Sequence, residues 1–296
     1  KVKTLELVFV CESCGSESPK WGGRCFSCGD WNTLVEFNKT EASKTFDTWH
    51  GTESVAPQEL SDIEVDKVGR LKFESSEINR VFGGGVVPGS VVLVAGEPGI
   101  GKSTLILRMA ADIAGSIGPT LYVTGEESVT QIKNRSNRLG IDGKQLILLQ
   151  TTVLGEIMHQ LDNIKPVLVI IDSIQTIYDD SLSSNPGSIM QVRECARKMM
   201  QWAKFHAVPI VLSGHVTKGG EIAGPRVLEH MVDVVLHMEG DPIRSWRLIR
   251  VVKNRFGSTN DVGVYEMTER GLIDVVDPSE TFLSERQKCA VGSVVV

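Results

Sequence analysis

Residues 96–103 read Gly96-Glu97-Pro98-Gly99-Ile100-Gly101-Lys102-Ser103 and match the pattern G-x-x-x-x-G-K-[ST] of a phosphate-binding loop. An apolar run of strand length, residues 90–95, comes directly before the loop. Residues 104–114 follow it with apolar side chains at helical spacing, and Gly115 ends this pattern. In the order strand, glycine loop, helix, main-chain N–H groups and the helix N-terminus face a phosphate. The stretch therefore predicts a binding site for a nucleoside triphosphate.

The residue types in this loop predict the parts of a magnesium–nucleotide site. Lys102 is expected to reach the β- and γ-phosphates, and Ser103 is expected to ligate Mg²⁺. The residues predicted to bind the nucleotide are Gly96, Glu97, Pro98, Gly99, Ile100, Gly101, Lys102, Ser103 and Thr104. The alternative is a glycine-rich turn before a core helix, and the predicted strand and helix on either side argue against it.

Asp172 ends a second apolar run, residues 167–171, downstream of the loop. Five apolar residues followed by one acid are typical of a parallel strand buried on both faces, with an aspartate that holds Mg²⁺ through water. Between the two motifs, a predicted strand at 120–124 leads to Glu126. Two interpretations of Glu126 stay open here: a carboxylate that polarises an attacking water, or an acidic residue placed favourably at a helix N-terminus.

Four of the six cysteines form two C-x-x-C pairs separated by ten residues, and they are Cys11, Cys14, Cys25 and Cys28. This spacing predicts a small ribbon in which four thiolates surround Zn²⁺. Without a recognisable secretory signal, the expected compartment is reducing, and metal binding is favoured over disulfides. Four cysteine ligands close the coordination shell, so the zinc is expected to be structural and not catalytic.

The overall composition limits the class of protein. The chain has 296 residues, 41% hydrophobic and 23% charged, which suits about two globular domains. Its longest apolar runs are far shorter than the roughly 20 residues that span a bilayer, so no membrane is expected as a partner. The predicted division is a zinc ribbon at 1–37, a polar linker at 38–66 and a nucleotide-binding core at 67–278. The net charge of −6 argues against a uniformly basic nucleic-acid binder, but a local basic groove is still allowed.

The densest positive stretch lies near the end of this core. Residues 242–260 contain two aromatic residues, no acid and five basic residues: Arg244, Arg247, Arg250, Lys253 and Arg255. Basic residues interleaved with aromatics suit single-stranded nucleic acid. An arginine at the edge of such a sheet also suits a finger that reaches a neighbouring subunit's γ-phosphate. The third interpretation is a strand with a solvated basic face.

Several motifs together resemble one family. They are the four-cysteine motif, GEPGIGKST (96–104), YVTGEES (122–128), VIIDSIQT (169–176), GHVTKGGEIAGPRVLEHMVD (214–233) and KNRFG (253–257). This set resembles RadA/Sms, the RecA-like DNA repair and recombination ATPases of bacteria and plant organelles. The resemblance implies an α/β RecA-like P-loop NTPase core: a mostly parallel sheet flanked by helices, with antiparallel strands at its C-terminal side. A small N-terminal zinc ribbon precedes this core, and residues 279–296 would begin a truncated C-terminal Lon-like domain.

The resemblance also implies roles for individual residues. Glu126 would be the catalytic glutamate that activates water, and His215 would sense the γ-phosphate. Lys253 and Arg255 would reach across a subunit interface or towards DNA. The implied catalytic set is Lys102, Glu126, Asp172, His215 and Arg255, and the implied DNA-binding residues are Lys218, Arg226 and Lys253. Ser103 and Asp172 would hold magnesium.

The expected cofactors are ATP, Mg²⁺ and Zn²⁺. The resemblance implies a homo-oligomer, a hexameric ring, that translocates on single-stranded DNA, acts on branched recombination intermediates and works with a RecA-type recombinase. The expected location is the cytoplasm of a bacterium, or a mitochondrion or chloroplast of a plant. Two alternatives remain: a KaiC-like ring ATPase in protein signalling, and a zinc-ribbon adaptor whose nucleotide state controls partner binding.

Overall fold

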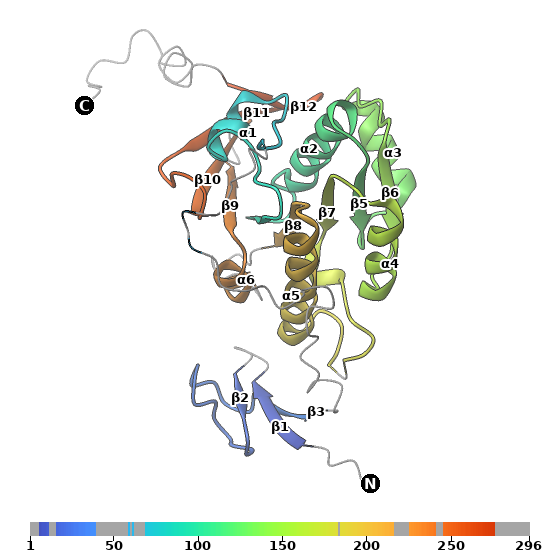
Figure 1. The fold of residues 1–296 in the computed structure, drawn as a ribbon. Helices are drawn as coiled ribbons and strands as arrows, with labels where there is room; N and C mark the ends of the chain where they lie inside the picture. Colours follow the sequence, from blue (N-terminus) through green and yellow to red (C-terminus); the bar gives the residue numbers. More distant parts are fainter. Residues whose placement is uncertain are drawn as a thin grey trace, which may run out of the picture.

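One nine-stranded sheet organises the described residues between 69 and 275. The computed structural model describes residues 6–11, 16–39, 59, 61, 69–182, 184–215, 225–240 and 245–275. The strands are β4 (Val91–Gly96), β5 (Thr120–Thr124), β6 (Leu146–Gln150), β7 (Leu168–Asp172), β8 (Ile210–His215), β9 (Val234–Gly240), β10 (Trp246–Asn254), β11 (Val262–Thr268) and β12 (Gly271–Asp274). Their spatial order is β12-β11-β10-β9-β4-β8-β7-β5-β6 (Figure 1).

Strand direction divides this sheet into two parts. From β9 to β6, neighbouring strands are parallel, and from β9 through β10 and β11 to β12 they are antiparallel. The carboxyl ends of β4, β5, β7 and β8 therefore meet at one edge. This is the edge at which open parallel sheets bind ligands. The arrangement confirms the predicted fold class.

The helices lie on both faces of the sheet. They are α1 (Ser76–Val81), α2 (Lys102–Ser116), α3 (Val129–Arg138), α4 (Leu154–Ile164), α5 (Ile189–His206) and α6 (Pro225–Met231), with a short 3-10 helix at Ile174–Thr176. The ends of several are set by local chemistry. The pattern Ser128-x-x-Gln131 predicts a capping box at the start of a helix, and the structure has this box at the start of α3. No helix in the described part of the chain is long and apolar enough to cross a membrane.

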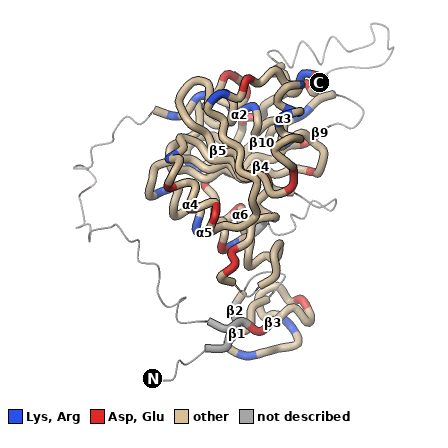
Figure 2. Tube along the Cα trace, turned by 90° about the vertical axis from the view of Figure 1, so that its right-hand side faces the viewer, with Lys and Arg blue, Asp and Glu red and all other residues tan. Residues whose placement is uncertain are grey.

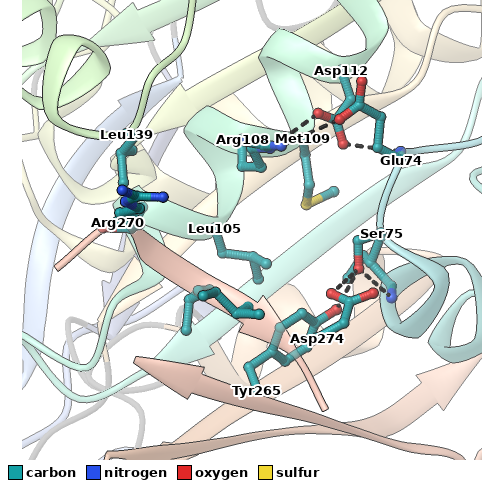
Figure 3. Close-up of a pocket in the computed structure, with 14 residues that line it drawn as sticks. Glu74, Ser75, Leu105, Arg108, Met109, Asp112, Leu139, Tyr265, Arg270 and Asp274 are labelled. Atoms are coloured by element: carbon teal, nitrogen blue, oxygen red, sulfur yellow. Dashed lines mark hydrogen bonds and ion pairs between the residues drawn. The ribbon is translucent and has the colours of Figure 1, made fainter. Parts of the chain in front are cut away.

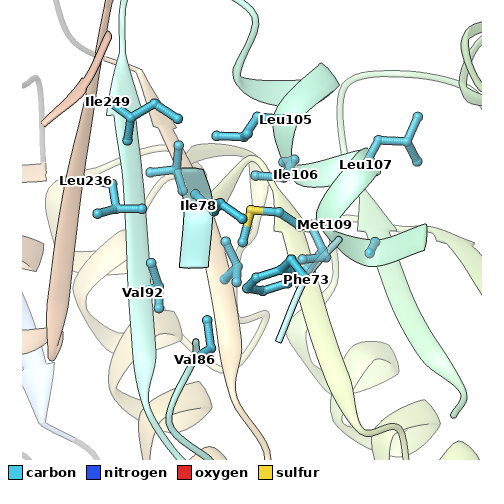
Figure 4. Packing of buried hydrophobic residues seen from close by; sticks show 14 of the residues in the cluster. Phe73, Ile78, Val86, Val92, Leu105, Ile106, Leu107, Met109, Leu236 and Ile249 are labelled. Atoms are coloured by element: carbon cyan, nitrogen blue, oxygen red, sulfur yellow. The ribbon is translucent and has the colours of Figure 1, made fainter. Parts of the chain in front are cut away.

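Successive side chains of the parallel strands alternate between two separate hydrophobic cores, one on each face of the sheet. On one face, Val92 and Leu236 pack against Ile106 and Met109 of α2 (Figure 4). The opposite face has its own cluster, whose strand residues include Leu93 and Ile171 and whose helical residues come mostly from α4 and α5. Each fully buried Leu or Ile contributes roughly 1.5–3 kcal/mol. Burial on both faces explains why these strands are continuous apolar runs.

A cavity of about 450 Å³ lies beside the first half of α2 (Figure 3). Several of its polar groups pair with one another. Arg108 contacts Glu74 and Asp112 at 3.2 and 3.3 Å, and Asp274 accepts from the hydroxyl of Ser75 at 2.7 Å. Burial raises the pKa of the Asp112 carboxyl. These contacts hold the start of α1 against α2 and β12, so this part of the wall supports the fold.

The N-terminal ribbon is a separate small sheet. Its strands are β1 (Glu6–Cys11), β2 (Glu17–Ser18) and β3 (Leu34–Lys39), paired antiparallel in the order β2-β1-β3. Its small core contains Phe9, Cys11, Cys25 and Leu34. Along the described chain, basic and acidic residues are interspersed (Figure 2), which fits the modest net charge of −6.

Candidate active site and zinc centre

The phosphate loop joins the end of β4 to the start of α2. Gly99 and Gly101 have φ angles of 78° and 118°, a region that favours glycine. A Cβ atom on Gly96 would lie 2.6 Å from the carbonyl oxygen of Met238, and one on Gly101 would lie 2.6 Å from Cε of Met267. The backbone can therefore follow this path only with glycine at these positions. The structure therefore has a loop between β4 and α2 at the same residues at which the sequence pattern predicts one.

Lys102 lies inside the loop with 4% of its surface exposed. Its Nζ donates to the carbonyl oxygens of Gly96 and Glu97, at 2.8 and 2.9 Å. Burial lowers the pKa of Lys102, although the charges of Asp172 and Glu126 oppose this shift. An ammonium group has three N–H donors, so one donor remains for a phosphate oxygen. The residue thus fits the binding of a triphosphate.

Asp172 lies at the carboxyl end of β7, on the same face of the sheet as α2. The hydroxyl of Tyr122 donates to its Oδ2 at 2.8 Å. Burial, with the Asp172 charge added, raises the pKa of Tyr122 well above its ordinary value, so this donor keeps its proton. The hydrogen bond fixes the carboxylate and uses only one of its oxygen atoms. The other oxygen suits a water molecule of hydrated Mg²⁺.

Ser213 is a neighbour of Asp172 that sequence reasoning did not assign to the site. Leu212 pairs in register with Ile171, so the next residues, Ser213 and Asp172, lie side by side on the opposite face from that pair. Ser213 is fully buried, and its hydroxyl has no hydrogen-bond partner among the described residues. Buried polar groups normally have a partner. An orphaned hydroxyl beside Asp172 fits a site for a hydrated cation.

Glu126 follows β5, and its side chain contacts residues at the carboxyl ends of β7 and β8. Its Oε1 accepts from the hydroxyl of Ser173 at 2.6 Å and from Nε2 of His215 at 3.1 Å. Burial acts to raise the pKa of Glu126, but these hydrogen bonds and the nearby charge of Lys102 outweigh it, so the pKa is lowered. The group is therefore an ionised carboxylate at neutral pH. The structure brings together four of the predicted site residues, Lys102, Asp172, Glu126 and His215.

Glu126 and its neighbour Glu127 have different interaction partners. Glu127 forms an ion pair with Arg135 of α3. Helix α3 begins at Val129 and has no acidic residue in its first turn. Glu126 instead points to the strand ends, where it contacts His215. Of the two interpretations of Glu126, the geometry therefore favours the carboxylate that can polarise water.

The described basic residues of this stretch do not form one surface, because they are spread along the length of β10 and just past its end. Arg244 lies outside the described residues. Arg247 lies at the phosphate-loop end, where its Nε donates to the carbonyl of Ile100 at 2.9 Å. Arg250 pairs with Glu239 at 3.0 Å. Lys253 and Arg255 lie at the other end of the strand. The role of Arg247 against the loop was not expected from the sequence, since it depends on strand direction.

Arg255 is anchored far from the phosphate loop of its own chain. Its guanidinium pairs with Oδ1 of Asp233 at 2.9 Å, and Oδ2 of Asp233 accepts from the backbone N–H of Val91 at 3.0 Å. Val91 begins β4, whereas the loop follows the end of β4 at Gly96. Six strand residues span about 17 Å. Arg255 can therefore meet a γ-phosphate only if that phosphate belongs to another subunit.

Lys253 caps the helix that precedes β9. Its Nζ donates to the carbonyls of Glu229 and His230 in the last turn of α6, at 2.7 and 3.2 Å. Burial lowers the pKa of Lys253, with the charge of Arg255 adding to this shift. The two other predicted DNA-binding residues are less defined: Lys218 lies outside the described residues, and for Arg226 only the backbone position, within α6, is described.

The ribbon gathers three of the four predicted zinc ligands. The sulfur atoms of Cys11, Cys25 and Cys28 lie within 4.8 Å of one another, and those of Cys11 and Cys28 are 3.6 Å apart. Four sulfurs at the usual zinc distance would be about 3.8 Å apart in a tetrahedron. These three residues therefore fit a thiolate zinc site, and Cys14 lies outside the described residues. Cys195 is unsuited to this chemistry, because burial raises the pKa of its thiol to about 12.

We expect one tightly held Zn²⁺ per chain in protein purified without added zinc. In zinc-finger peptides such binding contributes about 10–16 kcal/mol of folding free energy, so Cys11→Ser should release the metal and unfold the ribbon. Nucleotide binding should persist, since the phosphate loop belongs to the larger sheet. Metal analysis and nucleotide titration measure both properties. Substoichiometric zinc together with a disulfide between these cysteines would contradict the prediction.

Known proteins resemble this chain in sequence and in fold. Residues 55–221 match the AAA domain family, and residues 9–36 match the rubredoxin metal binding domain. DNA repair protein RadA of Bacillus subtilis (strain 168) is 49% identical over 290 residues, covering 97% of this chain and 63% of its own length. The protein of the same name from Listeria monocytogenes is 46% identical over 288 residues, with coverages of 97% and 63%.

The fold has a relative among solved structures. A KaiC-like protein of Pyrococcus horikoshii OT3 aligns with a TM-score of 0.58 and 21% identity, covering 70% of this chain and 99% of that protein. At this identity the likeness concerns the fold alone. The curated relatives confirm the predicted resemblance to RadA, although the chain spans less than two thirds of their length. Because the matching family model covers more than half of its residues, the chain belongs to the AAA domain family.

Proposed function

We propose that the chain is a DNA-dependent ATPase of the RecA-like type that acts in DNA repair. The observation that carries the proposal is the meeting of Lys102, Asp172, Glu126 and His215 at the carboxyl edge of one parallel sheet. A buried cation, a fixed aspartate and an ionised glutamate are the groups that nucleotide hydrolysis requires. The similarity to proteins named DNA repair protein RadA supports DNA as the partner.

In this proposal the chain's own groups position and activate the reactants. Main-chain N–H groups of the loop and Lys102 bind the β- and γ-phosphates of ATP. Ser103 and Asp172 would hold Mg²⁺, which neutralises charge on the phosphate oxygens. Glu126 accepts a hydrogen bond from the attacking water and orients it towards the γ-phosphate. His215 contacts the same carboxylate, so a change at Glu126 reaches the end of β8 directly.

We further propose that the protein works as a ring, with six subunits as the expected number. The position of Arg255 at the amino-terminal edge of β4 supports action on a neighbouring subunit's nucleotide. Lys218, Arg226 and Lys253 would then contact single-stranded DNA. Translocation on single strands, branch migration of recombination intermediates and cooperation with a RecA-type recombinase complete the proposal. The named relatives are bacterial, which favours a bacterial cytoplasm over a plant organelle.

The first test is ATP hydrolysis with and without single-stranded DNA. We expect DNA to stimulate turnover. A KaiC-like signalling ATPase would hydrolyse ATP at the same rate in both conditions. A nucleotide-gated adaptor would bind ATP with little hydrolysis and would change its affinity for a protein partner instead. Unchanged turnover in DNA would therefore reject the proposal in favour of one of these two functions.

Arg255→Ala is expected to leave nucleotide binding intact and to reduce hydrolysis by about 10³-fold or more, because a trans-acting arginine stabilises charge only in the transition state.

Lys253→Ala should affect DNA binding instead. If Lys253 contacts one phosphate, its loss should lower the slope of log K for single-stranded DNA binding against log salt concentration by roughly 0.7. Turnover, nucleotide affinity and salt-dependent DNA binding distinguish the two roles.

Arg250→Ala is the matched control for both variants. Arg250 lies on the same strand, and its ion pair with Glu239 is exposed on both sides, so its loss should change little. Arg255→Ala also removes the partner of Asp233, whose side chain is 5% exposed. The double variant Arg255→Ala with Asp233→Asn separates this effect, since it removes the unpaired charge. If both basic residues can be replaced without effect on DNA, assembly or turnover, the stretch is only a solvated face.

A further inference from the structure

Three large aromatic side chains are exposed on the zinc ribbon. The exposed fractions are 64% for Trp21, 89% for Phe26 and 69% for Trp31. In the described part of the core, the most exposed large apolar side chain is Val252, at 55%. Aromatic side chains carry the largest apolar surfaces of any residues, so three of them in water on so small a unit indicate a surface that a ligand covers.

Two of these rings lie beside a pair of glycines, Gly22 and Gly23. A Cβ atom on Gly22 would be 3.8 Å from Cε2 of Phe26, and one on Gly23 would be 3.8 Å from Cζ3 of Trp31. Trp21 directly precedes these two glycines in the chain. The two glycines thus leave the space beside the rings free of side chains. Phe26 also lies between Cys25 and Cys28 in the chain, so bound zinc would fix its backbone.

Two cations are interleaved with the rings. Lys20 precedes Trp21, and the guanidinium carbon of Arg24 is 5.8 Å from the ring centroid of Trp31. Arg24 is held there, because its Nε donates to the carbonyl of Gly29 at 2.7 Å. An arginine over an indole ring keeps a positive charge at the edge of a stacking surface.

We propose that this surface, the ribbon platform (Trp21, Arg24, Phe26 and Trp31), stacks the bases of single-stranded DNA. Flat aromatic rings with adjacent cations match a polyanion that carries flat bases, and such stacking tolerates any base sequence. The inference rests on the proposed function for its ligand, but it places a DNA contact outside the ATPase core.

The test uses the full chain and two oligonucleotides of equal charge, (dT)30 and a 30-residue abasic strand. The variant Trp21→Ala/Phe26→Ala/Trp31→Ala should bind (dT)30 at least about tenfold more weakly than the parent, because each stacked base contributes roughly tenfold. Its affinity for the abasic strand should change less than about twofold. Quenching of tryptophan fluorescence by (dT)30 should also decrease in this variant. Phe205→Ala, an exposed aromatic of α5, is the matched control and should change neither affinity.

Zinc content and oligomeric mass are measured in parallel, to show that the variant keeps its ribbon and its assembly. Equal losses for both strands would overturn the inference, as would no loss for either. If the variant changes oligomeric mass instead, the platform is an interface between copies and not a DNA site. Arg24→Gln is a second variant that leaves the rings in place, and it should weaken binding to both strands. If the parent protein does not bind (dT)30, the proposed function fails together with the inference. If the parent and the triple variant bind (dT)30 equally well, only the inference is rejected.

Discussion

Lys102→Ala is expected to reduce ATP hydrolysis by about 10³-fold or more. The residue places a cation within the loop, and stabilisation of the transferred phosphoryl group depends on such charges. The fold should tolerate the change. Lys102 is almost fully buried, so replacing it removes a charge from a site where burial opposes ionisation. Turnover and thermal unfolding, measured on the same preparation, check both expectations.

Lys133→Ala is a suitable control for this variant, because Lys133 lies on the exposed side of α3. Its turnover and thermal midpoint should match those of the parent. Hydrolysis by Lys102→Ala at a rate near that of the parent would exclude the phosphate-loop assignment. A large loss of thermal stability in Lys102→Ala would show instead that the ammonium holds the loop together through Gly96 and Glu97.

Glu126→Gln is expected to reduce turnover by about 10²–10⁴-fold while ATP still binds, as for the loss of a general base. The side chain keeps its shape and can still accept from Ser173 and His215, but it can no longer take a proton from water. Single-turnover hydrolysis and nucleotide affinity measure these two properties. Equal losses in both would place Glu126 in nucleotide binding and not in the chemical step.

The acid side of the pH profile tests the same residue. Because the folded-state pKa of Glu126 lies below its ordinary value of 4.5, the carboxylate remains ionised as pH falls through that value. The stability contributed by its hydrogen bonds is likewise present above the unfolded pKa and is lost as pH falls through the folded one. Ser173→Ala removes one of the donors and should move the acid limb of turnover to higher pH. If the acid limb of the pH profile does not move, a group other than Glu126 controls turnover on the acid side.

Local patterns in the sequence predicted much of the fold. The glycines of the loop, the apolar run before Asp172 and the capping box at Ser128 each depend on residues close in the chain. One strand, β6, was missed, although its apolar residues 146–149 carry a signal of strand length. As an edge strand it is only partly buried, and it lacks the acidic or glycine-rich ending that marked its neighbours.

The parts of the site that the sequence did not predict depend on register and strand direction. Ser213 lies beside Asp172 only because β8 pairs with β7 in a particular register. The dense basic stretch suggested one surface, yet the direction of β10 sends Arg247 to the phosphate loop and Arg255 to the opposite edge. Such placements join residues far apart in the chain, and spacing along a single segment carries no information about them.

Strand β4 has a mechanical consequence for an assembly of several copies. One end of the strand receives the Asp233 carboxylate that Arg255 holds, and the other end becomes the phosphate loop. Its first five side chains are at most 1% exposed, and close-packed interiors transmit small displacements because they compress little. If Arg255 exchanges Asp233 for a neighbour's phosphate, the anchored end of β4 loses that restraint. The phosphate loop of each copy would then respond to the nucleotide that the adjacent copy holds. Such coupling is what the subunits of a ring need in order to hydrolyse ATP one after another.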